Sequence, residues 1–455
     1  MSSGGEVFVS STPFAKFIAV IDSYGQAVAL RSETKGRESL VGDIWLGKVA
    51  RPVPGHEAVF VSLGDTITGM LHGRFEPGTI MVVQIVRDSF GSKAPLLTNL
   101  PVYSGKYLLY CPEGKIDRVS RKIKNTLFRE KLKKLLNKLN RPKGAFIARR
   151  FCDNSEIEIL EEEARWLVKC AQNVDSEIQN SSKLRLLYSA GGLVGSVCNQ
   201  FALEGKYIWF DDQHEYNKSK ANDLIYCPSI MKSLRLSSDE DLFERYDLHN
   251  QWQTTLGSDV LLPSGGKLTI EETAACVTID VDSGTKKRSN SQQIACYEAI
   301  AVCGNEIIRR NLAGLIAIDL PLVFGKKETD ELIRLMQSAL DKDQVSSDVL
   351  GLSHGGVLEV TRQRIGPSLL QALTEQNSQY PWFTRRWRPE ITAHRAICKA
   401  RREINSGSSA ITICANQCVL DLFSDYNSIA HWLRASFYIQ EDNKMSDDDF
   451  EVHSR

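Results

Sequence analysis

Three aspartates lie near the ends of two apolar segments in the second half of the chain. Asp280 lies near the end of the alternating run 275–281, Asp282 follows two residues later, and Asp319 interrupts the apolar run 313–320. Carboxylates at the ends of neighbouring strands can share a hard cation such as Mg²⁺, which prefers oxygen ligands. Such a cation polarises a phosphoryl group and lowers the pKa of a bound water. The pattern therefore predicts phosphodiester hydrolysis, although each acid taken alone is more often a turn or cap residue.

The segments around these acids are expected to form one sheet. Residues 267–270 and 275–281 alternate between apolar and polar side chains, which predicts a hairpin. The run 313–320 predicts a buried strand, and residues 293–310 have helical spacing and sufficient length to connect the two. Because side chains two apart on a strand share a face, Asp282 is expected to lie beside Asp280.

Composition limits the class of protein. At 455 residues the chain is too long for one core, and its 42% hydrophobic and 25% charged residues are typical of globular domains. The 56 basic and 56 acidic residues balance, which does not exclude a nucleic-acid partner, because binding depends on where positive charge clusters. The 11 cysteines lack the spacing of a disulfide scaffold, and no signal segment or membrane-length apolar run is present, so we expect a soluble, cytoplasmic protein.

The segment from the Ser-Gly-Gly motif onward resembles the catalytic core of the ribonuclease E/G family. The residues that match are Ser264, Gly265, Gly266, Asp280, Val281, Asn311, Leu312, Gly314 and Asp319. The resemblance implies that Asp280 and Asp319 bind Mg²⁺ in an endoribonuclease specific for single strands, with Asp282 orienting the ion or the water. The positions that depart from the family pattern are Ala274, where the family has Glu, and Asp282 and Cys296, where it has Asn. Glu298 keeps the acid of the last motif.

The departure at Asp282 leaves two interpretations. An Asn can donate and accept hydrogen bonds, whereas a carboxylate only accepts them and adds negative charge, so Asp282 can be a metal ligand or can repel a phosphate. The first interpretation is a Mg²⁺-dependent endoribonuclease of RNA processing and decay that leaves 5′-phosphate and 3′-hydroxyl ends. The alternative is a catalytically impaired RNA-binding protein of the same family. Retention of Asp280 and Asp319 favours the enzyme.

The resemblance covers nearly the whole chain and implies an α+β, multidomain fold. The expected parts are an RNase H-like subdomain (1–40 and 183–257), an inserted S1-type OB fold (41–117), a 5′-sensor region (118–182), a DNase I-like catalytic subdomain (258–380) and a small C-terminal α/β domain (381–455). The short β runs and Gly-containing turns of residues 41–100 themselves predict a small barrel.

Two residues of the expected OB fold are candidate RNA contacts. Phe60 matches the base-stacking Phe of the family and Lys93 its basic residue, while Met70 replaces a second Phe. OB folds bind single strands by stacking bases and contacting phosphates. Without the resemblance, Phe60 is more often a core residue.

Two pairs of arginines are candidate phosphate ligands. Arg149 matches the Arg of the family motif that receives the 5′-monophosphate of RNA, and Arg150 replaces its Thr, so we expect reduced discrimination between mono- and triphosphorylated ends. Arg362 and Arg364 match a further motif. We expect them on one face of a strand, where they hold the scissile phosphate or form salt bridges within the fold.

The zinc-binding segment of the family is replaced in this chain. Residues 378–390 read SQYPWFTRRWRPE, without cysteine or histidine, so zinc is not expected. The pair Cys414 and Cys418 lies in an apolar run and is more often buried than metal-bound. A homodimer, if formed, is expected not to be linked by zinc.

Overall fold

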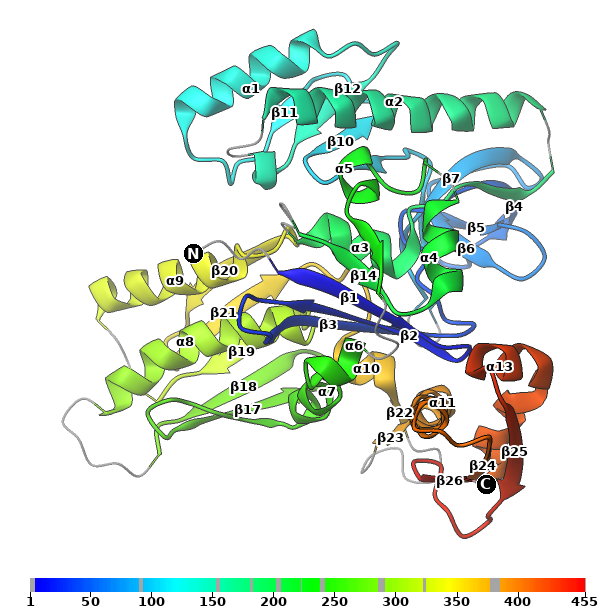
Figure 1. Ribbon diagram of the computed structural model, residues 1–455. Coiled ribbons are helices and arrows are strands. Elements are labelled where there is room, and N and C mark those ends of the chain that lie inside the picture. Colours follow the sequence, from blue (N-terminus) through cyan, green and yellow to red (C-terminus); the bar gives the residue numbers. More distant parts are fainter. Residues whose placement is uncertain are drawn as a thin grey trace.

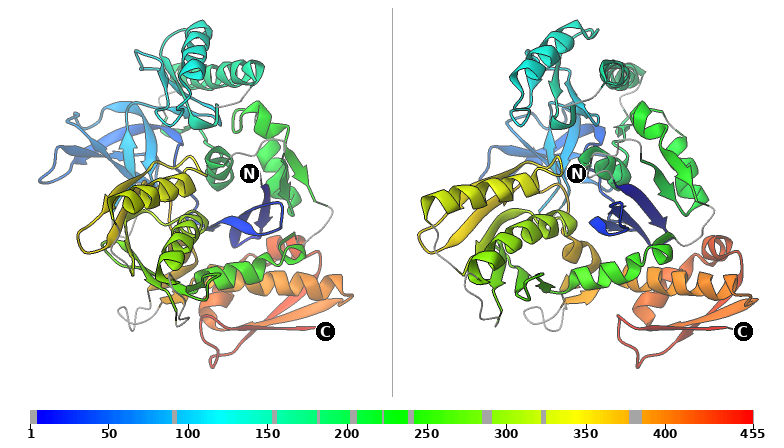
Figure 2. Two further views of the ribbon diagram at one scale, coloured as in Figure 1. Left: turned by 90° about the vertical axis from the view of Figure 1, so that its left-hand side faces the viewer. Right: turned by 60° about the vertical axis from the view of Figure 1, so that its left-hand side comes forward.

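The computed structural model describes residues 5–89, 93–152, 156–180, 183–201, 206–221, 223–237, 242–284, 291–321, 325–376 and 385–454. Helices and strands divide among several sheets with separate hydrophobic cores (Figures 1 and 2). A mixed α+β multidomain fold is therefore confirmed, whereas the expected subdomain names and boundaries stay predictions. Within the described residues, no helix has the length and apolar character that crossing a membrane requires.

The first sheet joins two segments that are far apart in the sequence. Its strands, in spatial order, are β15 (Leu234–Leu236), β14 (Ile208–Phe210), β1 (Glu6–Ser11), β2 (Ala15–Ile21) and β3 (Ala27–Thr34). Val7 and Phe8 of β1 are buried in different cores, so both faces of the sheet are covered. The helices described between residues 192 and 256 are α3 (Gly192–Gln200), α4 (Gln213–Lys220), α5 (Pro228–Met231), α6 (Leu242–Arg245) and α7 (Leu248–Leu256).

A small closed barrel follows β3, as the sequence predicts. Its strands are β4 (Ile44–Pro52), β5 (Ala58–Ser62), β6 (Thr68–His72), β8 (Leu96–Thr98) and β7 (Ile80–Arg87). Pairing between β7 and β4 closes the barrel, and β13 (Arg185–Tyr188) adds to the edge of β4. The interior is filled by Val49, Val61, Val83 and other buried aliphatic side chains.

Residues 118–144, which are rich in lysine and arginine, include a helix packed on a third sheet, seen in cyan at the top of Figure 1. The elements are β9 (Tyr103–Ser104), β10 (Leu108–Cys111), β11 (Arg118–Val119), α1 (Thr126–Lys138), β12 (Ala145–Ala148), the 3₁₀ turn η1 (Arg150–Cys152) and α2 (Ile157–Asn180). Helix α1 begins where the Asn125 side chain accepts a hydrogen bond from Phe128 N. Leu132 and Leu136 of this helix are buried.

The expected catalytic segment forms a six-stranded sheet with one covered face. Its strands, in spatial order, are β16 (Asp259–Leu261), β17 (Lys267–Glu272), β18 (Val277–Asp282), β19 (Gly314–Asp319), β21 (Val357–Arg362) and β20 (Ser347–Leu352). Helices α8 (Ser291–Arg309) and α9 (Lys326–Leu340) pack on one face, over Ile279, Ile316 and Val360. The residues that alternate with these apolar positions along the strands are more exposed. The face of the sheet opposite the helices is therefore open to solvent.

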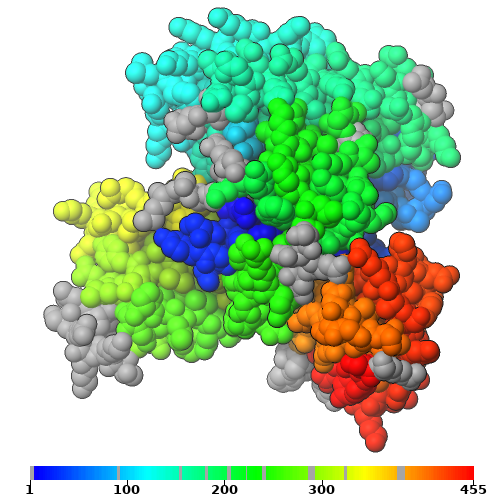
Figure 3. Space-filling view, in the orientation of Figure 1, coloured from blue at the N-terminus to red at the C-terminus, as the bar shows by residue number. Residues whose placement is uncertain are grey.

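The C-terminal residues form a separate lobe, orange and red at the lower right of Figure 3. Its elements are α11 (Pro389–Asn405), β24 (Ala410–Ala415), α12 (Gln417–Leu420), η2 (Asp421–Ser424), α13 (Tyr426–Leu433), β25 (Ser436–Glu441) and β26 (Phe450–Ser454). It is preceded by α10 (Leu369–Leu373) and by the paired strands β22 (Thr374–Gln376) and β23 (Arg385–Trp387). Cys414 is buried but Cys418 is exposed, so the expected burial of the cysteine pair is wrong for Cys418.

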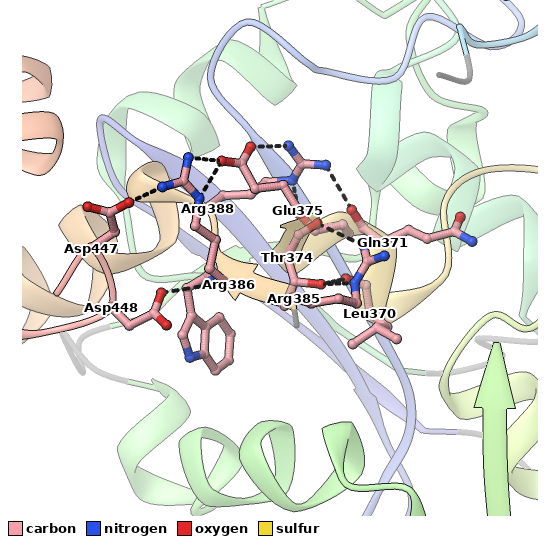
Figure 4. Close-up of polar contacts among 11 residues, drawn as sticks. Leu370, Gln371, Thr374, Glu375, Arg385, Arg386, Arg388, Asp447 and Asp448 are labelled. Carbon is pink, nitrogen blue, oxygen red and sulfur yellow. Dashed lines mark hydrogen bonds and ion pairs between the residues drawn. The ribbon is translucent and has the colours of Figure 1, made fainter. Parts of the chain in front are cut away.

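Arg386 connects this lobe to β22 by ion pairs, in the region where the family has its zinc segment (Figure 4). Arg386 pairs with Glu375 at 2.9 Å and also with Asp447 of the lobe, and Trp387 N donates to Asp448 at 2.8 Å. Residues 377–384, which include the first part of the segment that replaces the zinc site of the family, lie outside the described residues.

Candidate active site

Asp280 and Asp319 lie directly opposite each other on neighbouring strands. Strands β18 and β19 are parallel, and their register pairs these two residues. Neighbouring strands are about 4.8 Å apart, and both side chains are exposed on the open face of the sheet. The structure thus brings together the two acids that the sequence singled out, and their role as metal ligands stays a prediction.

Asp282 lies on the same face, at the end of β18. It is exposed, and its Oδ1 accepts a hydrogen bond of 2.9 Å from Gly284 N. One carboxylate oxygen therefore holds the turn that ends the strand. On β17, Lys267 is opposite Asp282 and Thr269 is opposite Asp280.

The Ser-Gly-Gly motif supports the end of β18. A Cβ on Gly266 would collide with the main-chain oxygen of Asp282, so only glycine allows this approach. Ser264 N donates a 2.9 Å hydrogen bond to Glu298 of α8. Glu298 therefore anchors the turn that contacts the aspartate strand, a role that its sequence motif does not reveal.

The other two departures from the family pattern lie away from the carboxylates. Cys296 is buried between α8 and the sheet, where burial raises the pKa of its thiol to about 11. Ala274 lies in the exposed turn between β17 and β18. Only Asp282 among the three departures is adjacent to the carboxylate pair.

The donor set at this site suits a hard cation. Asp280 and Asp319 are both exposed on adjacent strands, and carboxylate oxygens are the ligands that a hard cation prefers. No group of three or more His, Cys, Asp or Glu in the described ranges is arranged to hold a metal alone. Two carboxylates, completed by waters and substrate phosphate, are the usual protein contribution to a Mg²⁺ site.

Phe60 of the barrel is part of a row of three cross-strand neighbours. It is partly exposed and lies between Arg51 on β4 and Met70 on β6. The Arg51 guanidinium is 5.4 Å from the centre of the Phe60 ring. Sequence reasoning missed Arg51, because nothing in its local pattern indicates a partner on another strand. Lys93 is exposed beyond β7.

The adjacent arginines Arg149 and Arg150 have different partners. Arg149 Nη1 donates to Gly105 O at 2.6 Å, and burial lowers its pKa to about 10, so it stays a cation at neutral pH. Arg150 Nη1 is 3.0 Å from Asp341 Oδ1, and its other amino group donates to the main-chain oxygen of Asp343. Arg150 is therefore already bound to the loop after α9.

Arg362 and Arg364 do not share a strand face, so that expectation is wrong. Strand β21 ends at Arg362, whose side chain is on the helix-covered side and is 2.7 Å from Asp343 Oδ2. Its Nη1 also donates to Asn311 Oδ1 at 3.1 Å. Arg364 follows the strand and is 3.4 Å from Gln371 Oε1. The sequence left open whether Arg362 holds a phosphate or forms a salt bridge within the fold. In the structure Arg362 forms a salt bridge within the fold.

Comparisons with known proteins agree with the resemblance. A sequence model described as "Ribonuclease E/G family" matches residues 103–365. Ribonuclease G of Salmonella typhimurium (strain SL1344) is 26% identical over 402 residues, which cover 82% of each chain. Ribonuclease G of Haemophilus influenzae is 27% identical over 406 residues, again 82% of each chain. Ribonuclease E of Escherichia coli (strain K12) is 25% identical over 384 residues, covering 77% of this chain and 36% of its own. The predicted relationship is confirmed, and the chain belongs to the ribonuclease E/G family of endoribonucleases.

Proposed function

We propose that the chain is a Mg²⁺-dependent endoribonuclease that cleaves single-stranded RNA in RNA processing and decay, leaving 5′-phosphate and 3′-hydroxyl ends. The observation that carries the proposal is the register of Asp280 opposite Asp319, with both carboxylates exposed. Family membership supports the reaction class. The same proposal includes a cytoplasmic location and, where the chain dimerises, an interface without zinc.

In this proposal the three aspartates have two different roles. Asp280 and Asp319 hold the cation, which when bound polarises the phosphodiester and lowers the pKa of the attacking water. Asp282 orients the water through the carboxylate oxygen that is not hydrogen-bonded to Gly284. The Gly266 turn and Glu298 keep the end of β18 in place.

The remaining site residues bind the strand. Phe60 stacks on a base while Arg51 and Lys93 contact phosphates, as is common in OB folds. Arg149 receives the 5′-monophosphate, and Arg364, just past the end of β21, contacts the phosphate backbone of the RNA. We assign positioning roles to Arg150 and Arg362, because their guanidinium groups already bind Asp341 and Asp343.

A catalytically impaired RNA-binding protein is the second candidate. The observation that favours it is the extra negative charge of Asp282 beside the carboxylate pair, which opposes the approach of a phosphodiester. Both candidates bind RNA, so only a cleavage assay separates them.

The test uses 5′-monophosphorylated, A/U-rich single-stranded RNA with Mg²⁺. Wild type should cleave it, and Asp319→Asn should lose at least about a hundredfold in rate, because one of the two metal carboxylates is gone. Asp348→Asn is the matched control, since Asp348 is an exposed acid on strand β20 of the same sheet. Equal and negligible cleavage by wild type and Asp319→Asn, with intact RNA binding, would instead establish the impaired RNA-binding protein.

A further inference from the structure

Lys267 is the cation closest in register to the candidate metal carboxylates. It lies on β17 directly opposite Asp282, and Thr269, two residues on, lies opposite Asp280. Directly opposed side chains have Cβ atoms about 5 Å apart and point to the same face. Among the residues of the six strands of this sheet, Lys267 is the single lysine or arginine on the open face.

Asp259 on the edge strand β16 fixes the position of Lys267. Its Oδ2 accepts a 3.0 Å hydrogen bond from Lys267 Nζ, and its Oδ1 accepts one of 3.1 Å from Thr269. The Lys267 and Asp259 side chains are 41% and 53% exposed, so their ion pair adds little to the stability of the fold. The contribution of this ion pair to folding stability therefore does not explain why a lysine occupies position 267.

A positive charge near the three aspartates offsets part of their negative charge. Asp280, Asp282 and Asp319 lie together on two adjacent strands. A divalent cation held by Asp280 and Asp319 would offset two of these charges, and the charge of Asp282 remains to repel a phosphodiester. The pKa of Lys267 is raised, first by its hydrogen bond and charge interaction with Asp259 and then by Asp282 and Asp280. The ammonium group therefore interacts electrostatically with the aspartates of β18.

We propose that Lys267 contacts the phosphodiester of the RNA strand beside the Asp280–Asp319 pair and supplies the positive charge that offsets Asp282. An ammonium group has three donors, and one is used by Asp259, so two remain for phosphate oxygens. Asp259, which lies on the side of β17 away from the aspartates, is then a positioning residue that holds the ammonium group at the rim of the site. This inference rests on the proposed function and names a phosphate ligand within the same site.

The first experiment measures cleavage under single-turnover conditions. Lys267→Gln should lower kcat/KM roughly tenfold to hundredfold, as the loss of a charged contact to a reacting phosphate does. Lys267→Arg should recover part of the rate, because it keeps the charge. The matched control is Lys232→Gln, which removes an exposed lysine that is paired with Glu162 at 3.0 Å, and its rate should equal that of wild type.

The second experiment needs neither metal nor cleavage. Binding of a fluorescent single-stranded RNA is measured in EDTA at several salt concentrations. Lys267→Gln should weaken binding and reduce the slope of log K against log salt by about 0.7, the value for one phosphate contact on a single strand. Asp282→Asn should tighten binding. In the Asp282→Asn background, the loss caused by Lys267→Gln should be smaller, because less negative charge needs to be offset.

The outcomes separate the two proposals. If Asp319→Asn is inactive while Lys267→Gln matches wild type in rate, affinity and salt slope, the enzyme stands and the role of Lys267 is wrong. If wild type itself does not cleave, the proposed function fails, and the salt slope in EDTA still decides whether Lys267 contacts a phosphate. Thermal unfolding midpoints equal to that of wild type for Lys267→Gln and Lys232→Gln establish that both variants are folded.

Discussion

Arg362 and Asp343 form an ion pair of 2.7 Å in which neither side chain has any exposed surface. The same Asp343 oxygen accepts a 2.8 Å hydrogen bond from Gln200 of α3, and Arg150 donates to the Asp343 main chain. Asp343 therefore joins the six-stranded sheet, the helix α3 and the predicted 5′-sensor region at one point.

Breaking this pair should destabilise the protein strongly. Arg362→Met leaves the Asp343 carboxylate buried without its cation, which typically costs about 3–5 kcal/mol of unfolding free energy. Urea denaturation measures the change. Arg402→Gln is the control, because its pair with Glu244 at 3.0 Å is exposed and should contribute less than about 1 kcal/mol. A change below 1 kcal/mol for Arg362→Met would contradict the structural role of the pair.

Gly266→Ala should impair cleavage by displacing Asp282. The added methyl group collides with the main-chain oxygen of Asp282, and relief of the overlap shifts the end of β18 at a cost of about 1–3 kcal/mol. We expect a lower kcat with nearly unchanged RNA affinity. Gly355→Ala is the control, since the nearest atom to its Cβ is the Ser353 hydroxyl at 3.8 Å.

Asp211 should make stability depend on pH. Burial raises its pKa from an ordinary 3.8 to about 7, although it accepts a hydrogen bond from Ser11 N. The folded state therefore holds this proton more tightly than the unfolded state, so the contribution of Asp211 to stability falls as pH rises from about 4 to about 7. Asp211→Asn should raise the melting temperature relative to wild type at pH 8 but not at pH 4. An equal difference at both pH values would contradict this, and Asp65→Asn in an exposed turn serves as control.

Met70→Phe should tighten RNA binding. Met70 is opposite Phe60, so a second ring would extend the stacking surface, and base stacking on an aromatic ring contributes about 1–3 kcal/mol per base. The gain in RNA affinity should be insensitive to salt.

Arg51→Gln, in contrast, should reduce the slope of log K against log salt by about 0.7, because it removes a phosphate contact. Anisotropy titrations at two salt concentrations distinguish these effects.

Arg149 and Arg150 should differ in their effect on 5′-end preference. Arg149→Gln should reduce the preference for 5′-monophosphate over 5′-hydroxyl RNA. Arg150→Thr should leave that preference nearly unchanged, because Arg150 is held by Asp341 and the main chain of Asp343. Competition between differently terminated RNAs measures both. A loss of preference in Arg150→Thr similar to that in Arg149→Gln would show that Arg150 contacts the phosphate.

Local patterns predicted much of the six-stranded sheet. The alternation of residues 267–270 and 275–281 indicated two strands, which the structure places at 267–272 and 277–282. The helical spacing of residues 293–310 corresponds to α8 at 291–309. Periodicity also predicted that Asp280 and Asp282 share a face, because alternate side chains of a strand point the same way. The order of motifs along the chain was sufficient to identify the family, since it requires no knowledge of contacts.

Only the tertiary structure decided which residues of different strands are neighbours. A strand pattern specifies the face of a side chain but not the register against another strand, so the pairs Asp280–Asp319 and Lys267–Asp282 could not be derived from spacing. The strand end at Arg362 and its burial beside Asp343 likewise depend on a loop 19 residues earlier in the chain. The sequence by itself determined the family and the acids, and the packing of distant segments determined which charges meet.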